Sequence, residues 1–157
     1  MAGLTTTYLD HAALTARLHD LAANGCEGRA SVSSIGKSVQ GRDLWVVKIG
    51  APLGDAAAAA ATGADGTPLP GRARVKLIGN MHGDEVVGRT ILINLIEYVC
   101  GADGGADDPR VQQIRNAIDL YVLPTMNPDG HDLSLQSATP NHVRPLPDGP
   151  GLATRVR

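Results

Sequence analysis

A histidine and a glutamate three residues apart have the types and spacing best suited to chemistry in this 157-residue sequence. His82 and Glu85 stand in a His-Gly-Asp-Glu segment, shortly after an apolar run that is typical of a buried strand. Zinc accepts both imidazole nitrogen and carboxylate oxygen, at about 2.0–2.2 Å. A turn that leads into a helix can point both side chains at one ion, so the spacing predicts a metal site. A simpler interpretation needs no metal and leaves Glu85 as a carboxylate favoured by the start of a helix.

The segments around this pair predict an α/β fold. Residues 75–78 and 118–123 are apolar runs typical of buried strands, and residues 86–100 are so apolar that they predict a helix packed against a sheet. A strand, a helix and a second strand in this order indicate a right-handed βαβ unit with parallel strands. Ligands of open α/β sheets bind beyond the carboxyl ends of strands, which is where His82 and Glu85 stand.

Three further segments extend this unit. Residues 8–23 carry leucines at helical spacing, and Asp10 is suited to cap that helix. Residues 31–35 and 44–49 predict a hairpin, and Pro109 is suited to the first turn of a short helix. The predicted fold class is therefore a three-layer α/β/α sandwich with a mixed, mostly parallel sheet.

Two segments are expected to lie outside the regular elements. Residues 51–72 are rich in alanine, glycine and proline and are interpreted as a flexible surface insertion. Residues 133–157 contain four prolines without a sustained period and predict an irregular or disordered tail. Before that tail, the Asn-Pro-Asp-Gly sequence at residues 127–130 has the composition of a type I turn. The folded part is thus expected within residues 1–132.

Composition excludes several classes of function. The net charge is −2, so there is no basic excess to hold phosphates, and nucleic-acid binding is not expected. No apolar run approaches the roughly 20 residues of a membrane span, and the first residues lack the pattern of a signal peptide. Cys26 and Cys100 either form one bridge or remain two free thiols, and the sequence leaves both possibilities open.

Three segments closely resemble the zinc metallocarboxypeptidases, in the regulatory branch that contains carboxypeptidases D, E and N. They are SIGKSVQGRDLWVVKIG at residues 34–50, GNMHGDEVVGRTILINLIEYVC at 79–100 and LYVLPTMNPDGHD at 120–132. The resemblance implies that His82 and Glu85 are the first two zinc ligands. It also implies that the substrates are C-termini of peptides or proteins, with lysine or arginine as the residues released. Members of this family mostly act in the secretory pathway or outside the cell.

The same resemblance implies that part of the catalytic machinery is missing. In the family, the substrate-binding arginines, the third zinc ligand and the general-base glutamate all follow the Asn-Pro-Asp-Gly turn, but none of their motifs follows Asp132 here. Neither Glu27 nor Glu97 matches the base, and neither His131 nor His142 is expected to replace the third ligand. We therefore expect a truncated N-terminal half of the domain, inactive as a peptidase and with zinc bound weakly or not at all. The alternative is a non-catalytic half-domain that acts as a binding or regulatory module.

Overall fold

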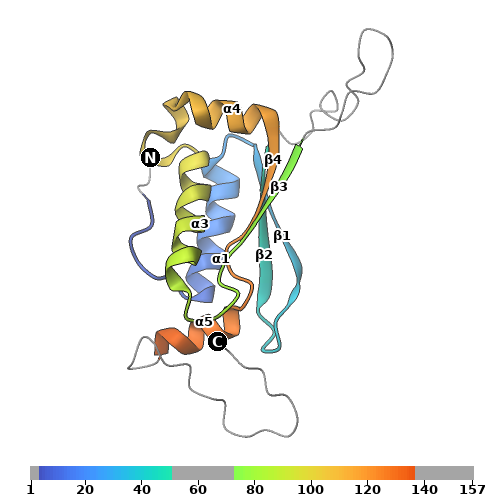
Figure 1. Ribbon diagram of the computed structural model, residues 1–157, viewed down its shortest axis with the longest axis vertical. Helices are drawn as coiled ribbons and strands as arrows, with labels where there is room; N and C mark the ends of the chain where they lie inside the picture. Colours follow the sequence, from blue (N-terminus) through green and yellow to red (C-terminus); the bar gives the residue numbers. More distant parts are fainter. Residues whose placement is uncertain (1–3, 51–72, 137–157) are drawn as a thin grey trace, which may run out of the picture.

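The computed structural model describes residues 4–50 and 73–136 (Figure 1), so the insertion predicted at residues 51–72 lies outside the described residues. Four strands form one sheet in the order β1-β2-β4-β3. Their bounds are β1 (Ala30–Lys37), β2 (Asp43–Ile49), β3 (Ala73–Ile78) and β4 (Ile118–Leu123). The pairs β1–β2 and β2–β4 are antiparallel, whereas β3 and β4 are parallel. The sheet is mixed, as predicted, but its antiparallel pairings outnumber the parallel one within the described residues.

Helices lie on one face of this sheet and at its two ends. They are α1 (His11–Asp20), which continues into η1 (Leu21–Gly25), then α3 (Val86–Val99), η2 (Ala102–Asp107), α4 (Pro109–Ala117) and α5 (Pro128–Gln136). Figure 1 shows α1 and α3 side by side on one face, α4 at the end where β4 begins and α5 at the opposite end. The α/β class is confirmed, and the described residues form two of the three expected layers. No described helix is long and apolar enough to cross a membrane.

The helix starts follow from local chemistry. Asp10 caps α1 by accepting a hydrogen bond from the backbone N–H of Ala13 at 2.7 Å, as predicted. Asp108 caps α4, and Pro109 occupies its first turn. Proline has no N–H, and at this position the helix would offer that N–H no partner. These caps fix where the two helices begin.

An aliphatic core fills the space between the sheet and the helices α1 and α3. It is built from side chains that are almost fully buried, among them Leu14, Leu18, Val47, Ile49, Ile93, Ile96, Leu120 and Val122. A disulfide between Cys26 and Cys100 closes one end of this core and links the segment after η1 to the end of α3. The bridge decides between the two possibilities that the sequence left open.

The segment after β4 is helical where the sequence predicted a turn and a tail. The side-chain oxygen of Asn127 accepts a hydrogen bond from the N–H of Gly130 at 2.9 Å. The backbone carbonyl of Asn127 accepts one from the N–H of His131 at 3.1 Å, so α5 begins here. Pro128 has a fixed φ that suits the first turn of a helix as well as a type I turn. The turn prediction is therefore wrong, and so is the irregular tail for residues 133–136, whereas residues 137–157 lie outside the described part of the chain.

Candidate functional site

His82 and Glu85 meet in the short loop between β3 and α3. The His82 Nδ1–H donates to Glu85 Oε1 at 2.7 Å, and the backbone N–H of His82 donates to Glu85 Oε2 at 3.1 Å. The loop follows the carboxyl end of β3, and Glu85 immediately precedes α3. Both side chains are about half exposed, at 45% and 50%. The structure thus brings the two sequence-predicted ligands together at an accessible position.

The electrostatics of this pair suit a metal ion. The hydrogen bond from the His82 side chain, with a second one from the His82 backbone, lowers the pKa of Glu85, so its carboxylate is ionised at neutral pH. An ionised carboxylate beside an imidazole nitrogen matches the donor types that zinc accepts. An ion contacted by both side chains would take the place of the proton between Nδ1 and Oε1. The pair therefore fits two positions of a zinc site.

No third ligand joins the pair within the described residues. They contain no group of three or more His, Cys, Asp or Glu side chains that could hold a metal. His131 is fully buried, and its Nε2–H donates to the Leu9 carbonyl at 3.1 Å. Glu97 is buried against Thr5 and Arg17, so it is engaged elsewhere. His142, the other histidine considered as a third ligand, lies outside the described residues.

Main-chain hydrogen bonds tie the His82 loop to the segment that follows β4. The N–H of Gly79 donates to the Leu123 carbonyl at 3.0 Å, and the Gly79 carbonyl accepts the N–H of Met126 at 3.0 Å. The Asn80 carbonyl accepts the N–H of Asn127 at 3.0 Å. The two chain segments at the carboxyl edge of β3 and β4 therefore form one connected unit.

Helix α5 supports the same loop from behind. The Gly83 Cα faces the backbone of Gly130 so closely that a Cβ at position 83 would overlap it, which makes glycine necessary at this position. The Ser134 hydroxyl lies 3.0 Å from the Gly83 carbonyl, which accepts its hydrogen bond. Sequence reasoning missed this support because it interpreted the start of α5 as a turn.

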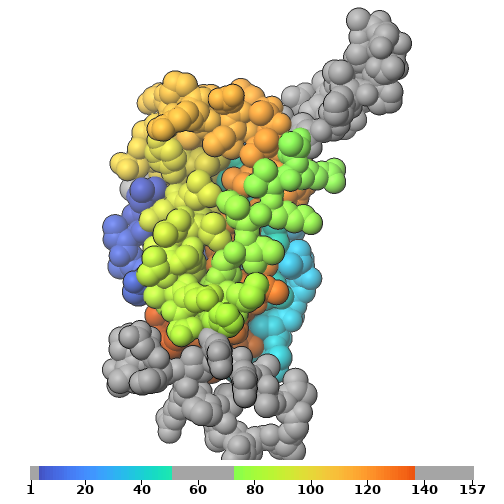
Figure 2. Space-filling view, viewed as in Figure 1, coloured from blue at the N-terminus to red at the C-terminus, as the bar shows by residue number. Residues whose placement is uncertain are grey.

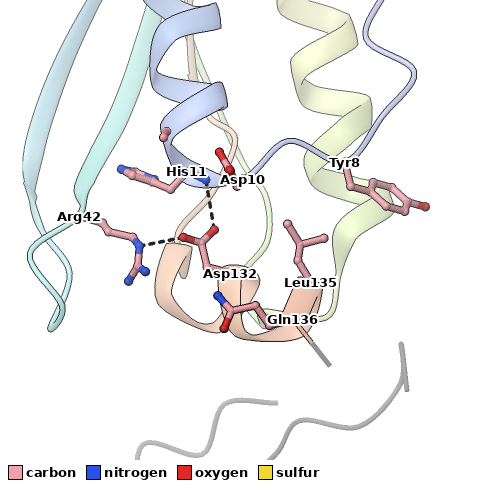
Figure 3. Close-up of a pocket in the computed structure, with 8 residues that line it drawn as sticks. Tyr8, Asp10, His11, Arg42, Asp132, Leu135 and Gln136 are labelled. Atoms are coloured by element: carbon pink, nitrogen blue, oxygen red, sulfur yellow. Dashed lines mark hydrogen bonds and ion pairs between the residues drawn. The ribbon is translucent and has the colours of Figure 1, made fainter. Parts of the chain in front are cut away.

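A pocket of about 590 Å³ lies between α5 and the start of α1 (Figure 3). In it, Arg42 contacts Asp132 at 2.9 Å, and the backbone N–H of His11 donates to the other oxygen of Asp132 at 3.2 Å. Both carboxylate oxygens are therefore engaged in holding α5 against α1 and the β1–β2 hairpin. Neither His82 nor Glu85 lines this pocket, whose residues are Tyr8, Asp10, His11, Ala12, Arg42, Asp132, Leu135 and Gln136.

Known proteins are similar to this chain in sequence and in fold. The sequence profile described as zinc carboxypeptidase matches residues 15–147. Carboxypeptidase D of Rattus norvegicus is 48% identical over 128 residues, which are 80% of this chain and 9% of that protein. Carboxypeptidase E of Caenorhabditis elegans is 35% identical over 130 residues, which are 82% of this chain and 24% of that protein.

Solved structures agree in fold. The structure of thrombin-activatable fibrinolysis inhibitor superposes with a TM-score of 0.65 at 13% identity, over 83% of this chain and 28% of that one. A metallocarboxypeptidase from Pseudomonas aeruginosa gives a TM-score of 0.53 at 28% identity, over 74% of this chain and 25% of that one. The chain spans about a tenth of the length of the rat carboxypeptidase D and about a quarter of the length of the Caenorhabditis elegans carboxypeptidase E. By its sequence and its fold, as its three motif segments predicted, the chain belongs to the zinc carboxypeptidase family.

Proposed function

We propose that this chain contributes His82 and Glu85 as two zinc ligands of a carboxypeptidase catalytic domain. The observation that carries the proposal is the 2.7 Å contact between His82 Nδ1 and Glu85 Oε1 at the carboxyl end of β3. The reaction of the complete domain is the hydrolysis of the last peptide bond of a peptide or protein. A C-terminal lysine or arginine is the proposed leaving residue, by analogy with the regulatory branch.

The residues of this chain prepare the site in two ways. Glu85 is held ionised by its hydrogen bonds from His82, which is the form of a carboxylate that binds metal. The loop that carries both side chains is held from behind by α5 through Gly83. Zinc bound here would supply Lewis acidity toward the scissile carbonyl and a bound water of low pKa.

We further propose that the 157-residue chain does not hydrolyse peptides by itself. Glu97 and Glu27 are its only other glutamates, and both are bound elsewhere: Glu97 to Arg17 at 2.8 Å, Glu27 to Arg115 at 3.3 Å. With two ligands among the described residues and no free glutamate to act as the base, we expect zinc binding in the micromolar range or weaker. Turnover then requires groups that lie outside this sequence.

A calorimetric zinc titration tests the ligand assignment. His82→Ala and Glu85→Gln should each weaken zinc binding by at least about tenfold. The matched control His19→Ala removes an exposed histidine whose ring contacts Trp45 and not the His82 loop, and it should leave zinc binding unchanged. Unchanged affinity in both site variants would refute the assignment. Release of arginine from a peptide that ends in arginine, dependent on added zinc, would instead refute the inactivity of the isolated chain.

A second candidate is a non-catalytic binding module. The side chains of Ile78, Val87 and Ile91 are 55–60% exposed, and Figure 2 shows α3 and β3 together on one face of the molecule. Exposed apolar groups on neighbouring elements are typical of protein contacts, and β3 is an edge strand of the described sheet. The zinc titration separates the candidates: zinc binding that is weakened in His82→Ala supports the metal site, whereas no zinc binding by the wild-type chain would favour the binding module.

A further inference from the structure

A buried asparagine lies directly beneath the loop that carries His82 and Glu85. Asn80 is only 2% exposed, and its φ of 52° lies in the left-handed region, which asparagine tolerates better than most residues. Its side-chain Nδ2 donates to the His82 carbonyl at 2.8 Å and to the Gly83 carbonyl at 3.2 Å. One amide group therefore holds two consecutive peptide units of the loop.

The Asn80 amide is itself fixed in one orientation. Its Oδ1 accepts a hydrogen bond from the Thr125 hydroxyl at 2.6 Å. That hydroxyl in turn accepts from Arg89 Nε at 2.9 Å, so its proton is directed toward Asn80. Thr125 and Arg89 are 2% and 1% exposed. Because Oδ1 is turned toward Thr125, the donor end of the amide is turned toward the loop.

The network continues to the N-terminal segment. Arg89 donates from its terminal nitrogens to the carbonyls of Leu9 and Asp10. A continuous series of buried hydrogen bonds thus runs from the residues before α1, through Arg89 and Thr125, to the loop after β3. Since low surrounding polarity strengthens such bonds, the loop is held by the interior of the fold and not only by its own turn.

We propose that Asn80 is a positioning residue of the zinc site: its amide holds the His82–Gly83 peptides so that the His82 and Glu85 side chains face one point. This inference rests on the proposed metal site. Outer partners that orient a ligand typically change metal affinity by about 10- to 100-fold when they are removed. Thr125 acts one step further from the ligands, so its removal should have a smaller effect.

The test compares variants that remove parts of this network but leave the left-handed conformation accessible at position 80. Asn80→Gly retains access to the left-handed conformation and removes the amide, whereas Thr125→Val removes only the hydroxyl that orients it. We expect the zinc dissociation constant to rise about 10- to 100-fold in Asn80→Gly and by less in Thr125→Val. Asn24→Gly, at an exposed position in η1, is the matched control and should bind zinc as the wild type does. Thermal unfolding identifies the folded fraction on which each affinity is measured.

Hydrogen exchange gives a second measurement that does not need the metal. The N–H groups of His82 and Glu85 are both bonded within the loop, to Glu85 Oε2 and to the His82 carbonyl. Both should exchange about tenfold faster in Asn80→Gly, or in Thr125→Val if the glycine variant does not fold. Folded variants with unchanged exchange and unchanged zinc affinity would overturn the proposal. If the wild type binds no zinc, the metal assignment fails, and faster exchange would still show that Asn80 orders the loop.

Discussion

Reduction of the Cys26–Cys100 disulfide should remove a large part of the stability of this chain. The two cysteines are separated by 74 residues, and the loop-closure relation gives about 4.4 kcal/mol at 25 °C for a loop of this length. Native domains have a total free energy of unfolding of about 5–15 kcal/mol. Because the bond joins the segment after η1 to the end of α3, its loss should loosen the packing of α1 against α3.

Guanidinium unfolding followed by circular dichroism measures this effect. The free energy of unfolding of the oxidised protein should exceed that of the same protein in reductant by about 4 kcal/mol. The double variant Cys26→Ala/Cys100→Ala should unfold like the reduced protein or slightly more easily, since the two buried sulfurs also pack in the core. Reductant should leave the stability of the double variant unchanged, which controls for other effects of the reagent.

Two results would refute this reasoning. One is a difference of less than about 1 kcal/mol between oxidised and reduced protein, which would mean that cross-linking the unfolded chain contributes little. The other is the titration of two free thiols in protein unfolded without reductant, which would mean that the bridge does not form.

Two other substitutions test the support of the site and its response to acid. Gly83→Ala should destabilise the protein by about 1–3 kcal/mol in thermal unfolding and weaken zinc binding, since the added Cβ would overlap Gly130. In the same thermal unfolding experiment, Gly88→Ala should stabilise the protein by up to about 1 kcal/mol, because its Cβ meets open space on α3. Equal effects of the two alanines would contradict the close contact. Burial lowers the pKa of His131, so the folded state favours neutral His131 and stability is lost as pH falls from about 6.5 toward the folded pKa, by at most about 1.4 kcal/mol per pH unit. His131→Phe should reduce that slope in guanidinium unfolding between pH 7 and 5, and an unchanged slope would assign the acid sensitivity to other groups.

The elements that position the site could be predicted because their signals are local. The strand at residues 118–123 and the helix at residues 86–100 are apolar runs bounded by polar or glycine-rich segments, and the structure has β4 and α3 there. His82 and Glu85 fall on the loop between a strand and a helix, and their spacing of three residues lets the two side chains meet there. The zinc chemistry proposed for the pair comes from the resemblance of the surrounding segments to the family.

The parts that could not be predicted depend on residues far apart in the sequence. Asp129 suits a turn equally well, but in α5 it accepts hydrogen bonds from Ser38 and Arg42, about 90 residues earlier, which hold that helix in place. The side chain of Asn80 accepts a hydrogen bond from Thr125, 45 residues later. The cysteine pairing likewise depends on a Cα–Cα distance of 4.3 Å across 74 residues. No local pattern contains these contacts.

The end of β2 and the start of β3 lie at the end of the sheet opposite to the proposed metal site. Ile49 pairs with Leu120 and Ala73 with Ile118, both near the start of β4, whereas His82 follows the far end of β3 (Figure 1). Six residues of extended strand place the two ends about 20 Å apart. A dye or a biotin attached at the exposed Ala73 would therefore hold the protein on a sensor surface by the end of the sheet that lies away from the His82 loop.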